Sequence, residues 1–372
     1  MAATGPQAKN AESRIKKYLG KIATGPKQSK DLTQEEAEDA LTSILNGAAS
    51  PVRSAVFLIA ARMKRETLDE NIGYWRALDR TTLKRRVNLD RLLQVADPFD
   101  GFNRTPYFGF YSIPVMAAMG LPSYGHSTLS LPPKFGITFQ DILHRHYQVP
   151  LDGSVEHVVR HLEENAFTFI PLQQSHPQLE RLRVLREEIV KRTALSTFEK
   201  MLMPLQAMGG ENYLATGYFH KGYEAPMIAA AELSGFQKTI IGNGMEGGSL
   251  YGVHKPARVF IVAKGKETQE LRLSLDDMFS ADTARQIREA FQALKTETPR
   301  LDSLAAWGEA ALKDGSGPAA PLVACQAGTI CRLVGLYPNH QAGFEAARHI
   351  LKRGTCYEKF MRFVQQSVNG NP

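Results

Sequence analysis

Three helix-start signals between residues 31 and 80 constrain this part of the chain more than any other feature. Thr33–Glu36 and Thr67–Glu70 have the spacing of a capping box, in which two side chains satisfy free amides at the start of a helix. Ser50–Pro51 supplies the cap and first residue of a helix between them. Apolar residues then recur at intervals of three and four. The sequence therefore predicts a small all-helical unit.

Farther along, short apolar segments alternate with helical ones. Such alternation predicts a mostly parallel sheet flanked by helices, so the fold class is α/β with a small all-helical N-terminal domain. The expected strands lie in "LLQVADPF", "LPSYGH", "NAFTFIPLQ", "ENYLATGYF" and "KTIIGNGM", and one helix is expected over "PQLERLRVLREEIVKRT". Residues 257–275 alternate around Gly265 and predict an antiparallel hairpin, whereas residues 282–368 predict helices.

These patterns divide the chain into three parts. Residues 1–30 form a basic extension with a short amphipathic helix, residues 31–90 a helical domain that a later helical segment can join, and residues 91–372 an α/β domain with phosphate- or ligand-binding loops.

Composition limits the function classes. The formal net charge of +7 favours an anionic partner, either a phosphorylated metabolite or nucleic acid. The three cysteines of the chain have neither the spacing of a zinc site nor that of a disulfide framework. No apolar run reaches the length of a membrane span. The start lacks the apolar core of a secretory signal. We therefore expect a cytoplasmic protein with no membrane partner.

Residues 124–143, "YGHSTLSLPPKFGITFQDIL", combine the glycine, serine, proline and lysine of a ligand-binding loop with a helix start. Lys134 is a flexible point charge suited to phosphate, and the amides of residues 136–139 would open the next helix toward it. The alternative is a solvated surface lysine in a shaped turn. Both interpretations stay open from the residues alone.

Two long segments resemble a known family. Residues 32–78, "LTQEEAEDALTSILNGAASPVRSAVFLIAARMKRETLDENIGYWRAL", are similar to the N-terminal helical domain of anthranilate phosphoribosyltransferases and pyrimidine nucleoside phosphorylases, in glycosyltransferase family 3. The segment "FIPLQQSHPQLERLRVLREEIVKRT" resembles the family's run from a strand, through a His-Pro turn, to an arginine and an Arg-Thr pair. Departures elsewhere indicate a divergent paralogue group, not the tryptophan-pathway enzyme.

The departures lie in the family's ligand motifs. The phosphoribosyl pyrophosphate (PRPP) loop of the family reads GTGGD, whereas "ADPFDGFNRTPYFG" stands here, and an Asp-Glu pair that holds magnesium is reduced to Glu246. The resemblance implies an acceptor site at His176 and Arg186, the latter on the arginine that contacts the anthranilate carboxylate. It implies a phosphate site at Asp100, Gly101, Asn103, Arg104, Thr105, His126, Ser127 and Lys134.

Each of these residues also has a structural interpretation. His126 can be satisfied by neighbouring backbone, Arg186 can pair with a glutamate, and residues 100–105 can be a polar turn.

Two functions follow. The first is transfer or binding of a phosphoribosyl group, with magnesium as cofactor and PRPP as partner. The second is nucleic-acid binding without sequence preference, by similarity to paralogues that keep the fold, to which the basic run at residues 84–86 could contribute. In both cases the resemblance implies a homodimer formed through the helical domain.

Overall fold

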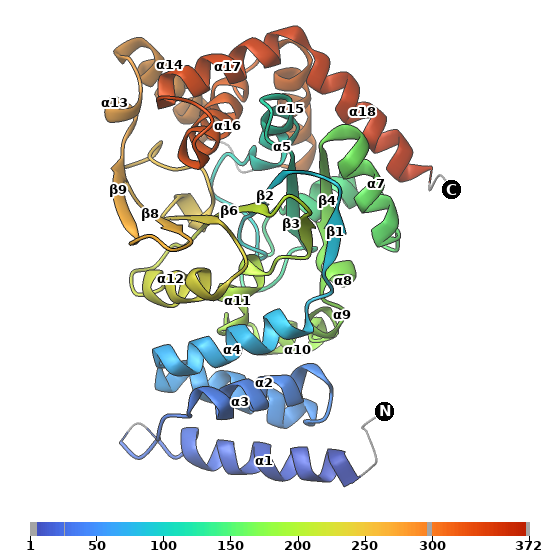
Figure 1. Cartoon of the computed structure of the whole chain (residues 1–372), viewed down its shortest axis with the longest axis vertical. Coiled ribbons are helices and arrows are strands. Elements are labelled where there is room, and N and C mark those ends of the chain that lie inside the picture. Colours follow the sequence, from blue (N-terminus) through green and yellow to red (C-terminus); the bar gives the residue numbers. More distant parts are fainter. Residues whose placement is uncertain (1–5, 26, 296–299, 370–372) are drawn as a thin grey trace.

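Four helices stack at one end of the molecule (Figure 1). The computed structural model describes residues 6–25, 27–295 and 300–369, so the first five residues of the predicted extension lie outside the described part. Both predicted capping boxes are present, and Ser50 caps the helix between them, which confirms the three expected helix starts. The helices are α1 (Pro6–Ile22), α2 (Gln34–Leu45), α3 (Pro51–Lys64) and α4 (Leu68–Thr81).

Helix α1 is part of this stack, because it packs against α2 and α3. Ile15 and Ile22 are buried in the contact. Asp39 of α2 accepts hydrogen bonds from Arg14 Nε at 2.7 Å and from the Tyr18 hydroxyl at 2.9 Å. The basic segment that precedes the first capping box is therefore a structural layer of the helical unit.

A seven-stranded sheet forms the centre, in the order β4-β3-β2-β6-β7-β8-β9. The first five of these strands run parallel, and β8 and β9 pair antiparallel, which confirms the expected parallel sheet and hairpin. The strands are β2 (Arg91–Ala96), β3 (Ser123–Ser127), β4 (Phe167–Pro171), β6 (Glu211–Gly217), β7 (Lys238–Gly242), β8 (Ala257–Ala263) and β9 (Gln269–Leu273).

A second sheet was not expected from the sequence. It consists of β1 (Arg85–Val87) and β5 (Leu205–Ala207), which pair in parallel. Strands of three residues are too short to carry a periodic hydrophobic pattern, so propensity alone does not reveal them.

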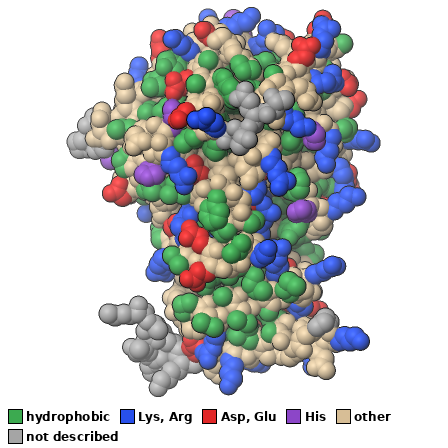
Figure 2. Space-filling view, turned by 180° about the vertical axis from the view of Figure 1, so that it is seen from behind, with side chains coloured by type: hydrophobic (Ala, Val, Ile, Leu, Met, Phe, Trp, Pro, Cys, Tyr) green, Lys and Arg blue, Asp and Glu red, His purple; other side chains and the backbone are tan. Residues whose placement is uncertain are grey.

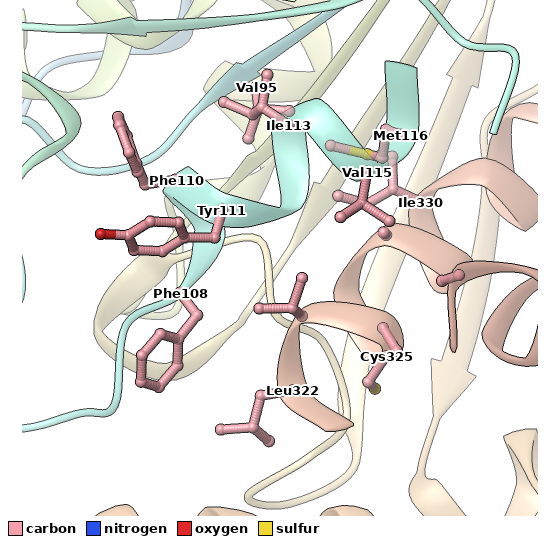
Figure 3. Close-up of a cluster of buried hydrophobic side chains, with 14 of the residues drawn as sticks. Val95, Phe108, Phe110, Tyr111, Ile113, Val115, Met116, Leu322, Cys325 and Ile330 are labelled. Carbon is pink, nitrogen blue, oxygen red and sulfur yellow. The ribbon is translucent and has the colours of Figure 1, made fainter. Parts of the chain in front are cut away.

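Helices cover both faces of the large sheet. On one face, Leu93 and Val95 of β2 pack with α5 and the C-terminal helices. Figure 3 shows Val95 beside Ile113 of α5. On the other face, residues such as Ile241 pack with α8–α12 and the helical unit. The remaining helices are α5 (Gly109–Ala118), α6 (Phe139–Asp141), α7 (Val155–Asn165), α8 (Leu172–Ser175), α9 (Pro177–Glu180), α10 (Arg183–Ile189), α11 (Leu195–Phe198), α12 (Glu224–Leu233), α13 (Leu275–Met278), α14 (Ala281–Lys295), α15 (Leu301–Asp314), α16 (Ala320–Val334), α17 (His340–Arg353) and α18 (Thr355–Val368).

The single helix expected over residues 177–193 is two short helices, α9 and α10. The interruption lies at Arg181 and Leu182. It precedes Arg183, whose Nη2 reaches the loop after β3 and donates to Thr128 Oγ1 at 2.6 Å and to the Leu129 carbonyl at 3.2 Å. Within the described ranges, no helix combines the length and apolar character needed to cross a bilayer.

Candidate functional site

The parallel strands β2, β3, β6 and β7 place the loops at their carboxyl ends along one edge of the sheet. We call this surface the carboxyl-edge face; it consists of residues 97–108, 128–138, 218–223 and 243–256. Ligands of open α/β sheets bind at such an edge. The predicted phosphate site lies in these loops, apart from His126 and Ser127 at the end of β3.

The loop after β2 closes around the carboxylate of Glu246. That carboxylate accepts hydrogen bonds from the backbone N–H of Asn103 at 3.5 Å and of Arg104 at 3.1 Å, and from Thr105 Oγ1 at 2.8 Å. Lys134 Nζ lies 3.4 Å from Glu246 Oε1. The predicted phosphate donors thus converge on one anion, which belongs to the chain itself. We call this arrangement the Glu246 cluster.

Asp100 and Gly101 join the loop after β2 to the loop after β3. Asp100 pairs with Lys134 at 3.5 Å and with Arg192. Gly101 adopts a left-handed φ of 72°, and a Cβ there would overlap the carbonyl group of Gly136. Only glycine permits this approach. The loop that carries Asp100, the second carboxylate paired with Lys134, is therefore held in place by close backbone contact at Gly101.

His126 and Ser127 lie beneath this face. His126 is fully buried, its Nε2 lies 2.9 Å from Ser175 Oγ, and its ring meets Phe99 edge-on at 5.3 Å. Burial lowers the pKa of His126 to about 3, so the ring is neutral at physiological pH. Ser127 Oγ donates to the Thr128 carbonyl at 3.3 Å. Both side chains are therefore buried and contact other groups of the chain.

The two predicted acceptor residues also have internal partners. His176 Nδ1 accepts from the Leu179 amide at 3.0 Å and caps α9, and its Nε2 lies 2.8 Å from Thr81 Oγ1 of the helical unit. Arg186 is buried and binds Glu199 with two hydrogen bonds, of 2.7 and 3.0 Å. A guanidinium that pairs with both carboxylate oxygens has the geometry that an acceptor carboxylate would use.

Glu199 and Lys200 are site residues that sequence reasoning missed. Lys200 is buried, donates to the Gly217 carbonyl, and has a pKa lowered to about 8 by burial. Burial raises the pKa of Glu199, against the opposing effect of Arg186. The signal that could have revealed them is a charged pair inside the apolar run "TFEKMLMPL". Charged residues are rarely buried without partners.

The predicted magnesium ligand does not fit a metal site. The Glu246 carboxylate is already held by three hydrogen-bond donors and by Lys134. Among residues 6–25, 27–295 and 300–369, no three His, Cys, Asp or Glu side chains come together in a way that could hold a metal ion.

A narrow cavity of about 20 Å³ opens beside the Glu246 cluster. This is room for about one water molecule and not for a ligand. Its lining includes the buried Asp97, which accepts from the Tyr107 hydroxyl at 3.0 Å and from the Ser249 amide at 2.7 Å. His254 is the basic side chain in the lining, so the pocket offers no lysine or arginine for a pyrophosphate among the described residues.

Comparison with known proteins supports the resemblance. Residues 16–82 match the model of the glycosyl transferase family helical bundle domain. The crystal structure of anthranilate phosphoribosyltransferase from Thermus thermophilus is 25% identical, covers 95% of this chain and 99% of that chain, and superposes with a TM-score of 0.73. The chain is thus similar to an anthranilate phosphoribosyltransferase over nearly its whole length, and its N-terminal unit matches the family's helical bundle domain.

Two further relatives limit what this similarity shows. An uncharacterized protein of Aquifex aeolicus is 29% identical over 59% of this chain and 64% of its own length, so the match spans less than two thirds of that relative. The anthranilate phosphoribosyltransferase of Saccharomyces cerevisiae in complex with PRPP and Mg is 17% identical, over 96% of this chain and 98% of that one, with a TM-score of 0.70. The yeast protein therefore shares the fold.

Proposed function

We propose that this protein binds nucleic acid without sequence preference, on a phosphoribosyltransferase fold that no longer transfers a phosphoribosyl group. One observation carries the proposal. Both positions where the resemblance expects a ligand anion are taken by carboxylates of the chain, with Glu246 on the phosphate-loop donors and Glu199 on Arg186. A bound substrate would have to displace both carboxylates.

The charge balance supports a polyanionic ligand. The chain carries a formal net charge of +7, although Lys134, Arg186 and Arg192 are neutralised by internal carboxylates. Arg104, Lys191 and Lys221 are exposed, and none of the ion pairs found among the described residues involves them. Exposed cations supply the sequence-independent part of nucleic-acid affinity, because phosphate contacts release condensed counterions.

Phosphoribosyl transfer with magnesium and PRPP is the competing function. The observation in its favour is the Glu246 cluster itself, since its backbone and side-chain donors show that the rewritten loop still holds an anion at the carboxyl-edge face. The yeast enzyme was solved in complex with PRPP and Mg. That complex supports PRPP and magnesium as the ligands if this chain is still a transferase.

Two titrations distinguish these functions. We expect a fluorescent oligothymidylate of about 20 nucleotides to bind, with an affinity that falls steeply between roughly 50 and 200 mM salt. We expect calorimetry with PRPP and magnesium to give no saturable heat. Saturable, magnesium-dependent heat without oligonucleotide binding would instead support the phosphoribosyl function and refute our proposal.

We also propose a homodimer formed through the helical unit. Helix α3 supports it with a stripe of exposed apolar side chains, Val52 at 73%, Val56 at 46% and Met63 at 75% exposure. Figure 2 shows hydrophobic side chains gathered on the helical unit as seen from behind. The domain boundary at residue 90 stays a proposal, whereas helix α1 extends the helical unit to before residue 30. The three buried free cysteines support a cytoplasmic location.

A further inference from the structure

Two phenylalanines of the carboxyl-edge face project into solvent. Phe135, in the loop after β3, is 57% exposed, and Phe219, in the loop after β6, is 60% exposed. On the same face Phe99, Phe102 and Tyr218 are buried, and Tyr223 is 42% exposed. Single exposed apolar residues are common, but two large rings in the loops after β3 and β6, the strands that flank β2, require an explanation.

The two loops meet at the Glu246 cluster. Lys134, which precedes Phe135, lies 3.4 Å from Glu246 Oε1. On the other side, a Cβ on Gly247 would lie 3.6 Å from the backbone nitrogen of Phe219. Phe135 therefore follows, and Phe219 adjoins, a residue in contact with the same short segment, 246–247.

Defined contacts fix the backbone of Phe135 and the ring of Phe219. Phe135 has a left-handed φ of 48°, which is unfavourable for a bulky side chain, and its amide donates to the Leu131 carbonyl at 3.1 Å. The next residue, Gly136, is fixed against Phe102, because a Cβ there would lie 2.5 Å from the Phe102 nitrogen. The Phe219 ring meets His220 edge-on at 4.9 Å. Strain that the surrounding structure maintains is a feature of ligand-binding segments.

Exposed cations lie in the same loops or next to residues that contact this face. Lys221 is two residues after Phe219, and the Arg104 amide contacts Glu246 directly. Lys191 is next to Arg192, which pairs with Asp100 of the same face. Aromatic side chains interleaved with cations bind single-stranded nucleic acid, because each unpaired base offers a flat face for stacking.

We propose that Phe135 and Phe219 form a stacking platform that selects single-stranded over duplex nucleic acid. The inference rests on the proposed function and names its ligand class. The two phenylalanines stack on unpaired bases, while Arg104, Lys191 and Lys221 bind the flanking phosphates. A duplex keeps its bases stacked on one another, so it can use the cations but not the rings.

The test compares Phe135→Ala and Phe219→Ala with the wild-type chain. Fluorescence anisotropy would be measured with an oligothymidylate and an oligouridylate of about 20 nucleotides, and with a duplex of the same length. We expect each substitution to weaken single-strand binding about fivefold or more, and duplex binding by less than about twofold, with the salt dependence unchanged. Comparison of the two single strands distinguishes DNA from RNA as the ligand.

Conservative variants provide the matched controls. Phe135→Tyr and Phe219→Tyr keep the ring and should retain the affinity for single strands. Phe135→Leu keeps an apolar surface without the ring and should lose that affinity. Met208→Ala removes an equally exposed apolar side chain, 63% exposed, outside the carboxyl-edge face, and should change nothing. Wild-type binding that is salt-sensitive but equal for single strand and duplex would overturn the platform and leave the proposed function standing. A complete absence of oligonucleotide binding would refute both.

Discussion

The Glu246 carboxylate occupies a site built for an anion. It receives two backbone amides, one hydroxyl and one ammonium group, while its own backbone has a left-handed φ of 49°. Hydrogen bonds to a carboxylate are about twice as strong as those between neutral groups, so they offset the strain. An external phosphate would use the same donors. Glu246 therefore competes with any anionic ligand of this face.

Removing this competing charge should strengthen anion binding. We expect Glu246→Gln to raise oligonucleotide affinity about fivefold or more, since the amide is a weaker acceptor and Lys134 loses one of its two carboxylate partners. Glu270→Gln is the control, because it removes a surface charge that pairs with Arg258 away from the loops. Equal gains in the two variants, measured by anisotropy at one salt concentration, would show only a general charge effect.

At the scale of elements, the C-terminal helices pack through close backbone contact. A Cβ on Gly328 of α16 would lie 2.5 Å from the carbonyl carbon of Gly343 and the nitrogen of Phe344 on α17. Backbone atoms cannot move aside as a flexible side chain can, so the helices would have to separate. This packing supports α5, whose residues lie against α16 beneath the loops of the site (Figure 3).

A single methyl group at this contact should destabilise the fold. We expect Gly328→Ala to lower the free energy of unfolding by about 1–3 kcal/mol, which thermal denaturation would register as a lower Tm. Gly20→Ala is the matched control, since a Cβ at that helical position meets nothing within 4 Å. There the change should raise stability by up to about 1 kcal/mol. Equal stability of the Gly328 variant and the wild type would contradict the close contact.

Across the whole molecule, the helical unit presents apolar surface that remains exposed in the described part of the chain. Val52, Val56 and Met63 follow one face of α3 at intervals of four and seven residues, and all three are exposed. Such a stripe is the pattern of a helix with a partner. A second copy of the chain would bring the same stripe into a symmetric contact.

Charge on this stripe should separate the proposed dimer. We expect Val52→Glu and Met63→Glu to shift the molecular mass in solution, measured by light scattering after size exclusion, from that of a dimer to that of a monomer. Met208→Glu introduces the same charge at a methionine of similar exposure outside the helical unit and should leave the dimer intact. A wild-type chain that is already monomeric would contradict the proposal.

The sequence predicts features that depend on neighbours along the chain and misses those that depend on distant ones. The capping box of Thr33 is local, so its helix was predictable, as was the parallel sheet from its apolar segments. The Glu246 cluster joins residues more than 100 positions apart. The Arg186–Glu199 pair spans 13 positions and two short helices, and its burial is a property of the folded core.

That buried pair also constrains how this lineage can change. Losing Glu199 alone leaves the Arg186 guanidinium buried without a counter-ion, and losing Arg186 alone leaves a buried carboxylate; either loss costs about 3–5 kcal/mol. Removing the pair one residue at a time would therefore pass through a destabilised intermediate, unless a ligand supplied the missing charge. The two positions are thus coupled, and a substitution at one is tolerated only together with a substitution at the other.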